Sequence, residues 1–143
     1  MTRRYWFGLT APLLAPLAAC RPSAPFPDLF PPAVAGGWRR TDLNTVAPSD
    51  APDPVPRTAI ERLQIAGYQG PGKLEARAYE LDSSAVALDL AQRWRPSADT
   101  VFFYRDQYFV VIKWEEADRK ALEAFVRELQ SRLGQPKNRP EQP

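Results

Sequence analysis

The chain of 143 residues contains no histidine, the side chain that most often serves as a general base or metal ligand near neutral pH. It contains one cysteine, Cys20, which excludes an internal disulfide and a cysteine-ligated zinc site. It also has no glycine-rich phosphate loop and no EF-hand loop. We therefore expect a protein that is not an enzyme and that requires no cofactor and no metal.

An unrecognised hydrolase remains an alternative, with two possible kinds of catalytic site. One is a serine activated by a lysine, with Lys73 or Lys113 as the base. The other is a pair of carboxylates of the kind that glycosidases use. The acidic residues available for such a pair lie at predicted helix and strand ends, where acids are ordinary, so neither alternative has support in the local sequence.

The first nineteen residues have the organisation of an export signal. Arg3 and Arg4 provide a basic start, and the apolar run 5–19 follows at once. As a helix this run would reach only about 22 Å, which is short of the hydrocarbon core of about 30 Å, and Pro12 and Pro16 interrupt it. A short apolar run after basic residues is typical of a signal peptide rather than of a membrane anchor.

The boundary of this run, Leu17-Ala18-Ala19-Cys20, resembles the lipobox of bacterial lipoproteins. The resemblance implies that the Cys20 thiol carries a diacylglyceryl group, that the signal is cleaved between Ala19 and Cys20, and that the new amino terminus is acylated, commonly with palmitate. Two or three acyl chains hold a protein firmly at a membrane, whereas one does so marginally. Residues 2–7 also resemble a twin-arginine signal, so the export route stays open between this and general export.

Arg21 follows the lipidation site, where inner-membrane lipoproteins commonly have Asp. The resemblance therefore favours attachment to the outer membrane, facing the periplasm, although inner-membrane attachment stays open. Removal of residues 1–19 takes two of the 19 basic residues and none of the 17 acids, which leaves 17 of each and a formal net charge of zero. A neutral chain gives no electrostatic reason to expect nucleic acid binding.

The remaining chain is predicted to form one domain. Residues 21–56 hold nine prolines, and we interpret residues 20–37 as a Pro-rich tether. Residues 38–134 have the length of a single small domain, and the polar residues 135–143 are expected to be a disordered tail. The predicted domains are thus 1–19, 20–37, 38–134 and 135–143.

Three helices and a short turn of helix are predicted. Thr58 and Glu61 have the spacing of a capping box, and Gly67 is a typical helix stop. Ser83 or Ser84 is the expected cap of the second helix. The predicted helical ranges are 58–67, 84–95 and 116–133. One turn is predicted at 28–34, placing Phe26, Leu29, Phe30 and Val34 to dock on the domain.

The strand pattern is equally specific. Leu74, Ala76 and Ala78 alternate with charged residues, which indicates a half-buried antiparallel strand at 73–81. A hairpin is predicted over 100–114 with its turn at 105–107, and because both of its faces are apolar we expect two central strands. With a first strand at 38–41 and a loop at 44–56, the predicted fold is α+β, with about four strands, mostly antiparallel, helices packed on the sheet and a long C-terminal helix.

Seven aromatic residues lie between Trp94 and Trp114. One interpretation is a sheet core, because aromatic side chains favour strands and dominate burial. The other is a cleft for an apolar ligand, a lipid or a peptide. The candidate ligand-binding residues are then Tyr104, Tyr108 and Trp114, with Lys113 placed to pair an anionic group.

The mature region resembles a family of small secreted bacterial proteins known only as a domain of unknown function. The matching segments are Leu29-Phe30-Pro31, Gly37-Trp38, Tyr68-Gln69-Gly70, residues 74–81 and residues 83–88. The resemblance implies a fold unit of about a hundred residues and supplies no catalytic residues.

Together these features predict a lipid-anchored envelope protein, a non-catalytic module that binds a partner protein or helps to assemble an envelope complex. The alternative is a module that binds a small apolar or lipid-like ligand in the aromatic hairpin region. The identity of the partner or ligand and the oligomeric state stay open.

Overall fold

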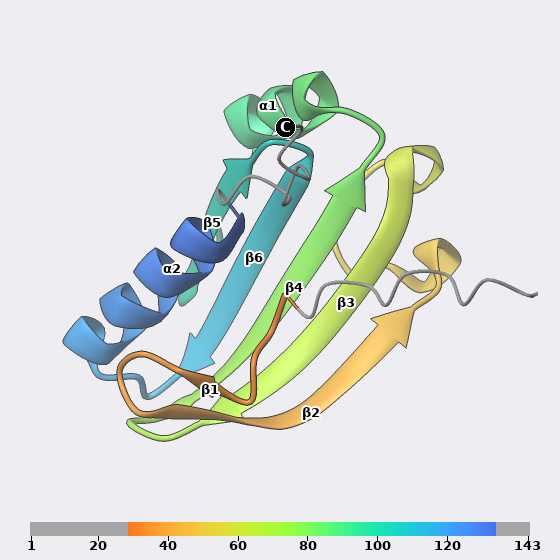
Figure 1. Cartoon of the computed structure of the whole chain (residues 1–143). Coiled ribbons are helices and arrows are strands. Elements are labelled where there is room, and N and C mark those ends of the chain that lie inside the picture. Colours follow the sequence, from red (N-terminus) through yellow and green to blue (C-terminus); the bar gives the residue numbers. More distant parts are fainter. Residues whose placement is uncertain (1–28, 134–143) are drawn as a thin grey trace, which may run out of the picture.

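The computed structural model describes residues 29–133, which form one antiparallel sheet with a helix on each face (Figure 1). The sheet is curled, and its strand order is β1-β2-β3-β4-β6-β5. Its strands are β1 (Ala33–Val34), β2 (Trp38–Val46), β3 (Ile60–Gln69), β4 (Lys73–Leu81), β5 (Thr100–Arg105) and β6 (Tyr108–Glu115). The helices are α1 (Ser84–Arg93) and α2 (Arg119–Leu133), and two short 3₁₀ turns are η1 (Pro48–Asp50) and η2 (Arg57–Ala59).

The predicted α+β class, the antiparallel sheet and the C-terminal helix are confirmed, but the sheet has six strands rather than about four. The main error is the helix predicted at 58–67, which is strand β3. A bulge between Ile60 and Arg62 and burial on both faces produce a spacing that imitates a helix. Ile60 and Leu63 face one side of the sheet, whereas Ala66 faces the other.

The fold also begins earlier than the predicted domain start at residue 38. Phe30 and Val34 are buried, although they fall within the segment interpreted as a tether. The turn of helix predicted at 28–34 is wrong, since Ala33 and Val34 form strand β1, which pairs with Arg39 and Trp38. Strand β2 continues to Val46, so the loop predicted at 44–56 starts later and contains η1.

The hairpin β5–β6 turns at Asp106, as predicted, with a positive φ of 52°. Strand β6 is central, between β4 and β5, but β5 is an edge strand, so the expectation of two central strands is wrong for β5. Both faces of β5 are apolar because helices pack near each face of the sheet there, and a second neighbouring strand is not the cause.

Two cores lie on opposite faces of the sheet. The larger core joins α2 and the β1 segment to the sheet through Trp38, Tyr68 and Phe125. The smaller core joins α1 and the loop 47–59 to the other face through Tyr79 and Phe109. Alternate residues of β4 belong to opposite cores, which confirms the strand predicted at 73–81.

Helix α2 is docked by specific contacts near its N-terminus. The Trp38 indole Nε1 donates a hydrogen bond to the Ala121 carbonyl oxygen at 2.9 Å. The Phe125 ring stacks edge-on against Trp38 and Tyr68, with ring centroids 6.0 and 4.9 Å apart. The Asp118 carboxylate accepts from the Ala121 amide at 3.0 Å, so the helix begins at Arg119 rather than at residue 116.

The second predicted helix is confirmed as α1, with Ser83 as its cap; the Ser83 hydroxyl accepts from the Val86 amide at 3.3 Å. None of the helices within residues 29–133 is long and apolar enough to cross a membrane.

The turn before β2 predicts a matched pair of variants. Gly36 and Gly37 both have positive φ, at +100° and +84°. A Cβ at Gly36 would lie 2.7 Å from the Ala121 carbonyl oxygen, whereas the nearest atom to a Cβ at Gly37 is 3.8 Å away. We expect Gly36→Ala to lower the unfolding free energy by about 2–4 kcal/mol and Gly37→Ala by about 1 kcal/mol. Equal losses in chemical denaturation would contradict the close packing of this turn on α2.

Candidate functional site

The edge strand β5 lies between two open hollows, one on each face of the sheet. On the α2 face, a hollow of about 670 Å³ separates the helix from the hairpin strands. Its volume falls within the range of small-molecule sites. We call it the α2 groove, and its lining residues are Val101, Trp114, Ala117, Arg119, Leu122, Glu123, Val126, Arg127 and Gln130.

The α2 groove has an apolar floor and a polar rim. Val101 and Trp114 come from the hairpin, and Leu122 and Val126 come from one face of α2. They gather there because Phe125 and Leu129 point into the core, which leaves the next face of the helix over β5. Such a surface suits an apolar side chain or an acyl chain.

Two arginines lie on the rim of the α2 groove. Arg119 Nε is 3.5 Å from the Glu123 carboxylate. Arg127, by contrast, makes no ion pair with another residue in the part of the chain that the structure describes. Among residues 29–133, the charge of Arg127 on this rim is therefore available to a ligand, close to the apolar floor.

On the α1 face, a second and more open hollow of about 460 Å³ lies against β5. We call it the α1 hollow; it is lined by Leu88, Ala91, Gln92, Phe102, Phe103 and Tyr104. Leu88 and Tyr104 are the two large hydrophobic side chains that are exposed within residues 29–133, at 40% and 44%. Exposed apolar surface on this structure is therefore concentrated beside β5.

The four candidate ligand-binding residues do not form one site. Trp114 lines the α2 groove, whereas Tyr104 lines the α1 hollow on the opposite face. Lys113 shares the face of Tyr104 but pairs with Thr100 at the other end of β5. Tyr108 is at the turn end of β6, six residues from Trp114, and burial followed by the charge of Glu80 raises the pKa of its phenol.

The lipidation site Cys20 and the cleavage position after Ala19 lie outside the described residues. The sequence reasoning missed the contribution of α2 to the groove. Leu122 belongs to the apolar stripe of a predicted helix, but the pattern gives no indication of which part of the stripe faces the core.

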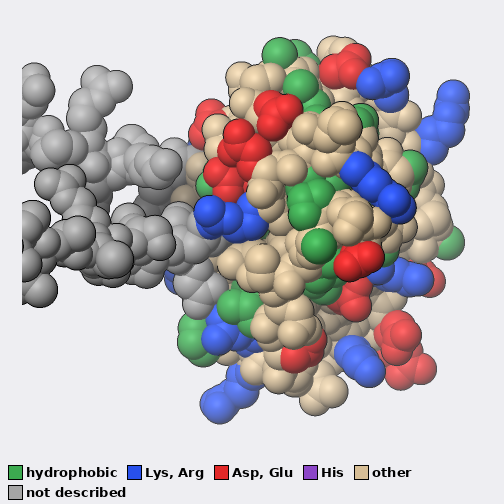
Figure 2. Space-filling model, turned by 90° about the vertical axis from the view of Figure 1, so that its right-hand side faces the viewer, with side chains coloured by type: hydrophobic (Ala, Val, Ile, Leu, Met, Phe, Trp, Pro, Cys, Tyr) green, Lys and Arg blue, Asp and Glu red, His purple; other side chains and the backbone are tan. Residues whose placement is uncertain are grey.

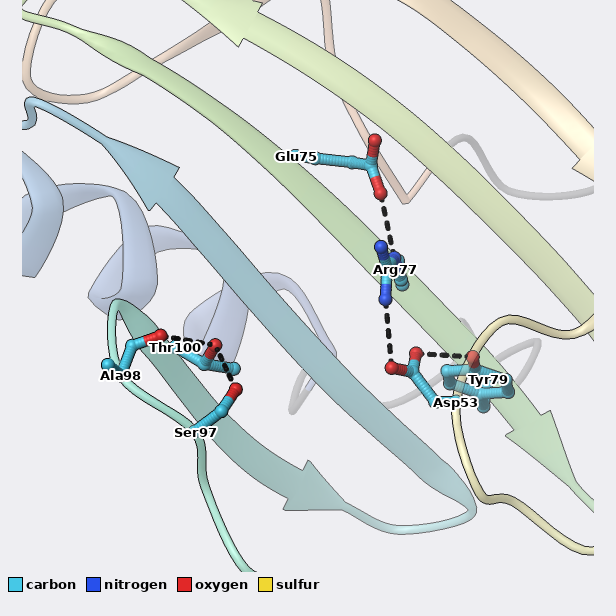
Figure 3. Close-up of polar contacts among 7 residues, drawn as sticks. All are labelled: Asp53, Glu75, Arg77, Tyr79, Ser97, Ala98 and Thr100. Atoms are coloured by element: carbon cyan, nitrogen blue, oxygen red, sulfur yellow. Dashed lines mark hydrogen bonds and ion pairs between the residues drawn. The ribbon is translucent and has the colours of Figure 1, made fainter.

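A partly buried polar network lies on the α1 face, and Figure 3 shows it as a chain of four side chains. Arg77 donates from Nε to Glu75 at 2.7 Å and from Nη1 to Asp53 at 2.8 Å. The Tyr79 hydroxyl donates to the other oxygen of Asp53 at 2.5 Å. Asp53 is thus held by two donors from β4, and it ties the proline-rich loop 47–59 to the sheet.

The network shifts the protonation of its members. Burial raises the pKa of the Tyr79 phenol, and the hydrogen bond to Asp53 and its charge raise it further. Burial alone would lower the pKa of Arg77, but the hydrogen bond to Glu75 and the charges of Asp53 and Glu75 raise it above its ordinary value. The neutral phenol and the charged guanidinium are therefore the stable forms, and neither group is poised to transfer a proton near neutral pH.

The sequence reasoning also missed this network. Arg77 and Glu75 were expected on the outer face of β4, and the alternation of the strand does place them there. Their partner Asp53 is 24 residues from Arg77, in a loop without periodicity. Only the fold of the loop over the sheet shows that these charges meet.

Charges on the surface are mixed. Figure 2 shows acidic and basic side chains interspersed, with apolar side chains between them, on the face beside β2 and β3. Such a face produces no extended field of one sign. Within residues 29–133 no group of three or more acidic or cysteine side chains is arranged to hold a metal ion.

Comparisons of the chain with protein-family models, with curated proteins and with solved structures found no match.

The Tyr79 network predicts a pH dependence of stability. Because the folded pKa of Tyr79 lies above the unfolded value of about 10, its contribution is fully present below pH 10 and is lost as pH rises through and above 10. We expect the unfolding free energy to fall above pH 10 by up to about 1.4 kcal/mol per pH unit for this group.

Tyr79→Phe is expected to weaken that decline and to cost about 1–3 kcal/mol at pH 7, because Asp53 loses a donor. Urea denaturation from pH 7 to 11 measures both effects. The exposed Tyr104→Phe is the matched control. An alkaline decline of the same slope in Tyr79→Phe and the wild type would disprove the assignment.

Proposed function

We propose that this protein is a lipid-anchored envelope protein, exported, attached through acylated Cys20, and facing the periplasm, with the outer membrane as its site. The support is the segment Leu17-Ala18-Ala19-Cys20 at the end of a short apolar run, with the chain's single cysteine at the acceptor position. Arg21 after it supports the outer membrane over the inner one, on the resemblance described above.

The length of chain between the lipid and the fold limits where the domain works. Eight residues, 21–28, separate Cys20 from Leu29, the first described residue. A chain of that length spans at most about 30 Å. In this proposal the domain stays within that distance of the membrane surface, so its partner is another component of the envelope.

We infer that the domain itself is a non-catalytic binding module, and that the α2 groove is the surface it uses for a partner protein. The observation that carries this is the groove of about 670 Å³ with its apolar floor, between α2 and the hairpin. The titratable groups with resolved pKa shifts, Arg77, Tyr79 and Tyr108, are absent from its lining. An apolar groove without such groups favours recognition over chemistry.

A second candidate function is the binding of a small lipid-like ligand in the same groove. The observation that favours it is Arg127, which has no ion partner among the described residues and lies beside Val126 and Trp114. An acyl chain on the floor with an anionic head at Arg127 would satisfy both surfaces.

The anchor is tested by the intact mass of the protein purified from its native host. We expect a mass equal to residues 20–143 plus two or three acyl chains, because the Cys20 thiol and the new amino terminus are both acceptors. Cys20→Ala should retain the uncleaved signal and carry no lipid. A wild-type protein that is cleaved but bears no acyl chain would overturn the proposed anchor and leave the groove proposals standing.

The groove is tested with Val126→Asp, which places a carboxylate on its floor, and with Thr58→Asp, which places one on the exposed turn η2 as the control. We expect Val126→Asp to reduce in-cell crosslinking to envelope proteins at least tenfold and Thr58→Asp to leave it unchanged, because an apolar partner surface does not accommodate a buried charge. Circular dichroism of both variants checks that they fold.

A fluorescent fatty acid separates the two candidates. If the ligand function holds, the probe binds the wild type, Arg127→Glu weakens binding about tenfold through charge reversal, and Val126→Asp abolishes it. If the partner function holds alone, the probe does not bind, and only the crosslinks respond to Val126→Asp. If Val126→Asp changes neither the crosslink yield nor the affinity for the probe, both proposed uses of the groove are contradicted.

A further inference from the structure

The two edges of the sheet differ in how they are protected. At one edge, the two-residue strand β1, which follows Pro31 and Pro32, covers only Trp38 and Arg39 of β2. The rest of that edge is β2 itself, which carries charged side chains and a bulge between Arg40 and Asp42, and both features disfavour pairing with another strand. At the other edge, β5 has six residues, contains no proline and pairs with β6 without a bulge. Within residues 29–133 no strand pairs with the outer side of β5.

The ladder between β5 and β6 shows which backbone groups face outward. The Trp114 amide donates to the Asp99 carbonyl oxygen at 3.0 Å. Because antiparallel residues alternate between bonded and non-bonded pairs, the next residues of β5 that bond to β6 are Val101 and every second residue after it. Thr100, Phe102 and Tyr104 therefore direct their amides and carbonyls away from the sheet.

This outer edge is self-complementary. When two copies of β5 lie antiparallel with Phe102 opposite Phe102 of the second copy, Thr100 faces Tyr104 of the second copy and Tyr104 faces Thr100. All three outward residues then fall in pairs that each exchange two hydrogen bonds. Because residues of the same face lie opposite each other, the two α1 hollows meet on one side, and the exposed Tyr104 and Leu88 beside them move toward the junction.

The charges at the ends of β5 match the same register. Asp99 directly precedes β5 with a φ of 57°, so it is not part of the extended strand, but in this register it lies near Arg105 of the second copy at each end of the paired strands. Both residues are exposed, and neither makes an ion pair with another residue of the described part of the chain. A two-fold axis through Phe102 therefore creates two opposite-charge pairs, one on each side of the axis.

We propose that two copies of this chain associate through β5, antiparallel and with Phe102 on the two-fold axis, to form one continuous sheet. The proposal goes beyond the function proposed above and is independent of the anchor, because it concerns a sheet edge remote from Cys20 in sequence. We name a second copy as the partner because three features agree with it: the backbone register, the charges near the ends of β5 and the exposed apolar residues beside the strand.

The register is tested with cysteine variants of the full chain, all carrying Cys20→Ser so that the introduced thiols are the only ones. Thr100→Cys and Tyr104→Cys combined should crosslink two chains under a mild oxidant, because the two positions face each other with Cα atoms about 5.5 Å apart. Each single variant is the matched control. Thr100 lies about 14 Å from Thr100 of the second copy, beyond the reach of a disulfide, and the same holds for Tyr104.

Association is tested by sedimentation of the full chain with Cys20→Ser. We expect a species of twice the mass of one chain. Tyr104→Pro should raise the dissociation constant at least tenfold, because it removes an outward amide and leaves the ladder to β6 intact. Tyr104→Thr keeps that amide and should stay dimeric. Phe102→Cys should form a crosslink by itself, and it provides a second test if the double variant does not fold.

Any of three results would overturn the proposal. The first is a protein that stays monomeric at about 100 μM and forms no crosslink in the double variant. This would show that the edge is not paired with a second copy. Crosslinks of the single variants as strong as those of the double variant would show another register or non-specific contact. A dimer that Tyr104→Pro leaves unchanged would place the interface elsewhere on the molecule.

Discussion

The docking of α2 on the sheet is the contact on which most of the structure depends. Trp38 joins the two through its ring and through the hydrogen bond from Nε1 to the Ala121 carbonyl, and Phe125 fills the space between Trp38 and Tyr68. These contacts hold the helix against one face of a curled sheet of six strands. One helix of fifteen residues does not cover that whole face. The β1 segment covers one side of it, and the side toward β5 remains open as the α2 groove.

The opposite face is closed by different means. There a proline-rich loop rather than a long helix packs on the sheet, and its attachment depends on Asp53 receiving hydrogen bonds from Arg77 and Tyr79 (Figure 3). A partly buried charge in a loop is favourable only when its partners are in place. The network therefore stabilises the one position of the loop in which Asp53 meets both donors. Helix α1 completes this face beside β5, and the α1 hollow remains between them. The α2 groove and the α1 hollow therefore lie beside the same edge strand, β5.

This arrangement is the basis for the proposed role in recognition. The side chains of Asp53, Arg77 and Tyr79 hold the loop, and the pKa shifts of Arg77 and Tyr79 stabilise the forms already present at neutral pH. The α2 groove, with its apolar floor and charged rim, and the mainly apolar α1 hollow lie on the two sides of the edge strand β5. In the proposed anchored state, a short tether would raise the effective concentration of the domain toward other membrane-attached molecules.

The comparison of sequence with structure separates local from long-range information. Elements whose signals lie within a few residues were predictable from the sequence: the β5–β6 turn at Asp106, a serine cap at 83 or 84 for α1, the alternation along β4 and the apolar stripe of α2. The prediction failed at β3, where a bulge and burial on both faces produced a helical spacing around Leu63. Four features became visible only in the tertiary structure. They are the strand order, the edge position of β5, the contact of Asp53 with Arg77, and the face of α2 that lines the α2 groove. Each of these depends on which distant segments pack together, and that information is not contained in the pattern of any one segment.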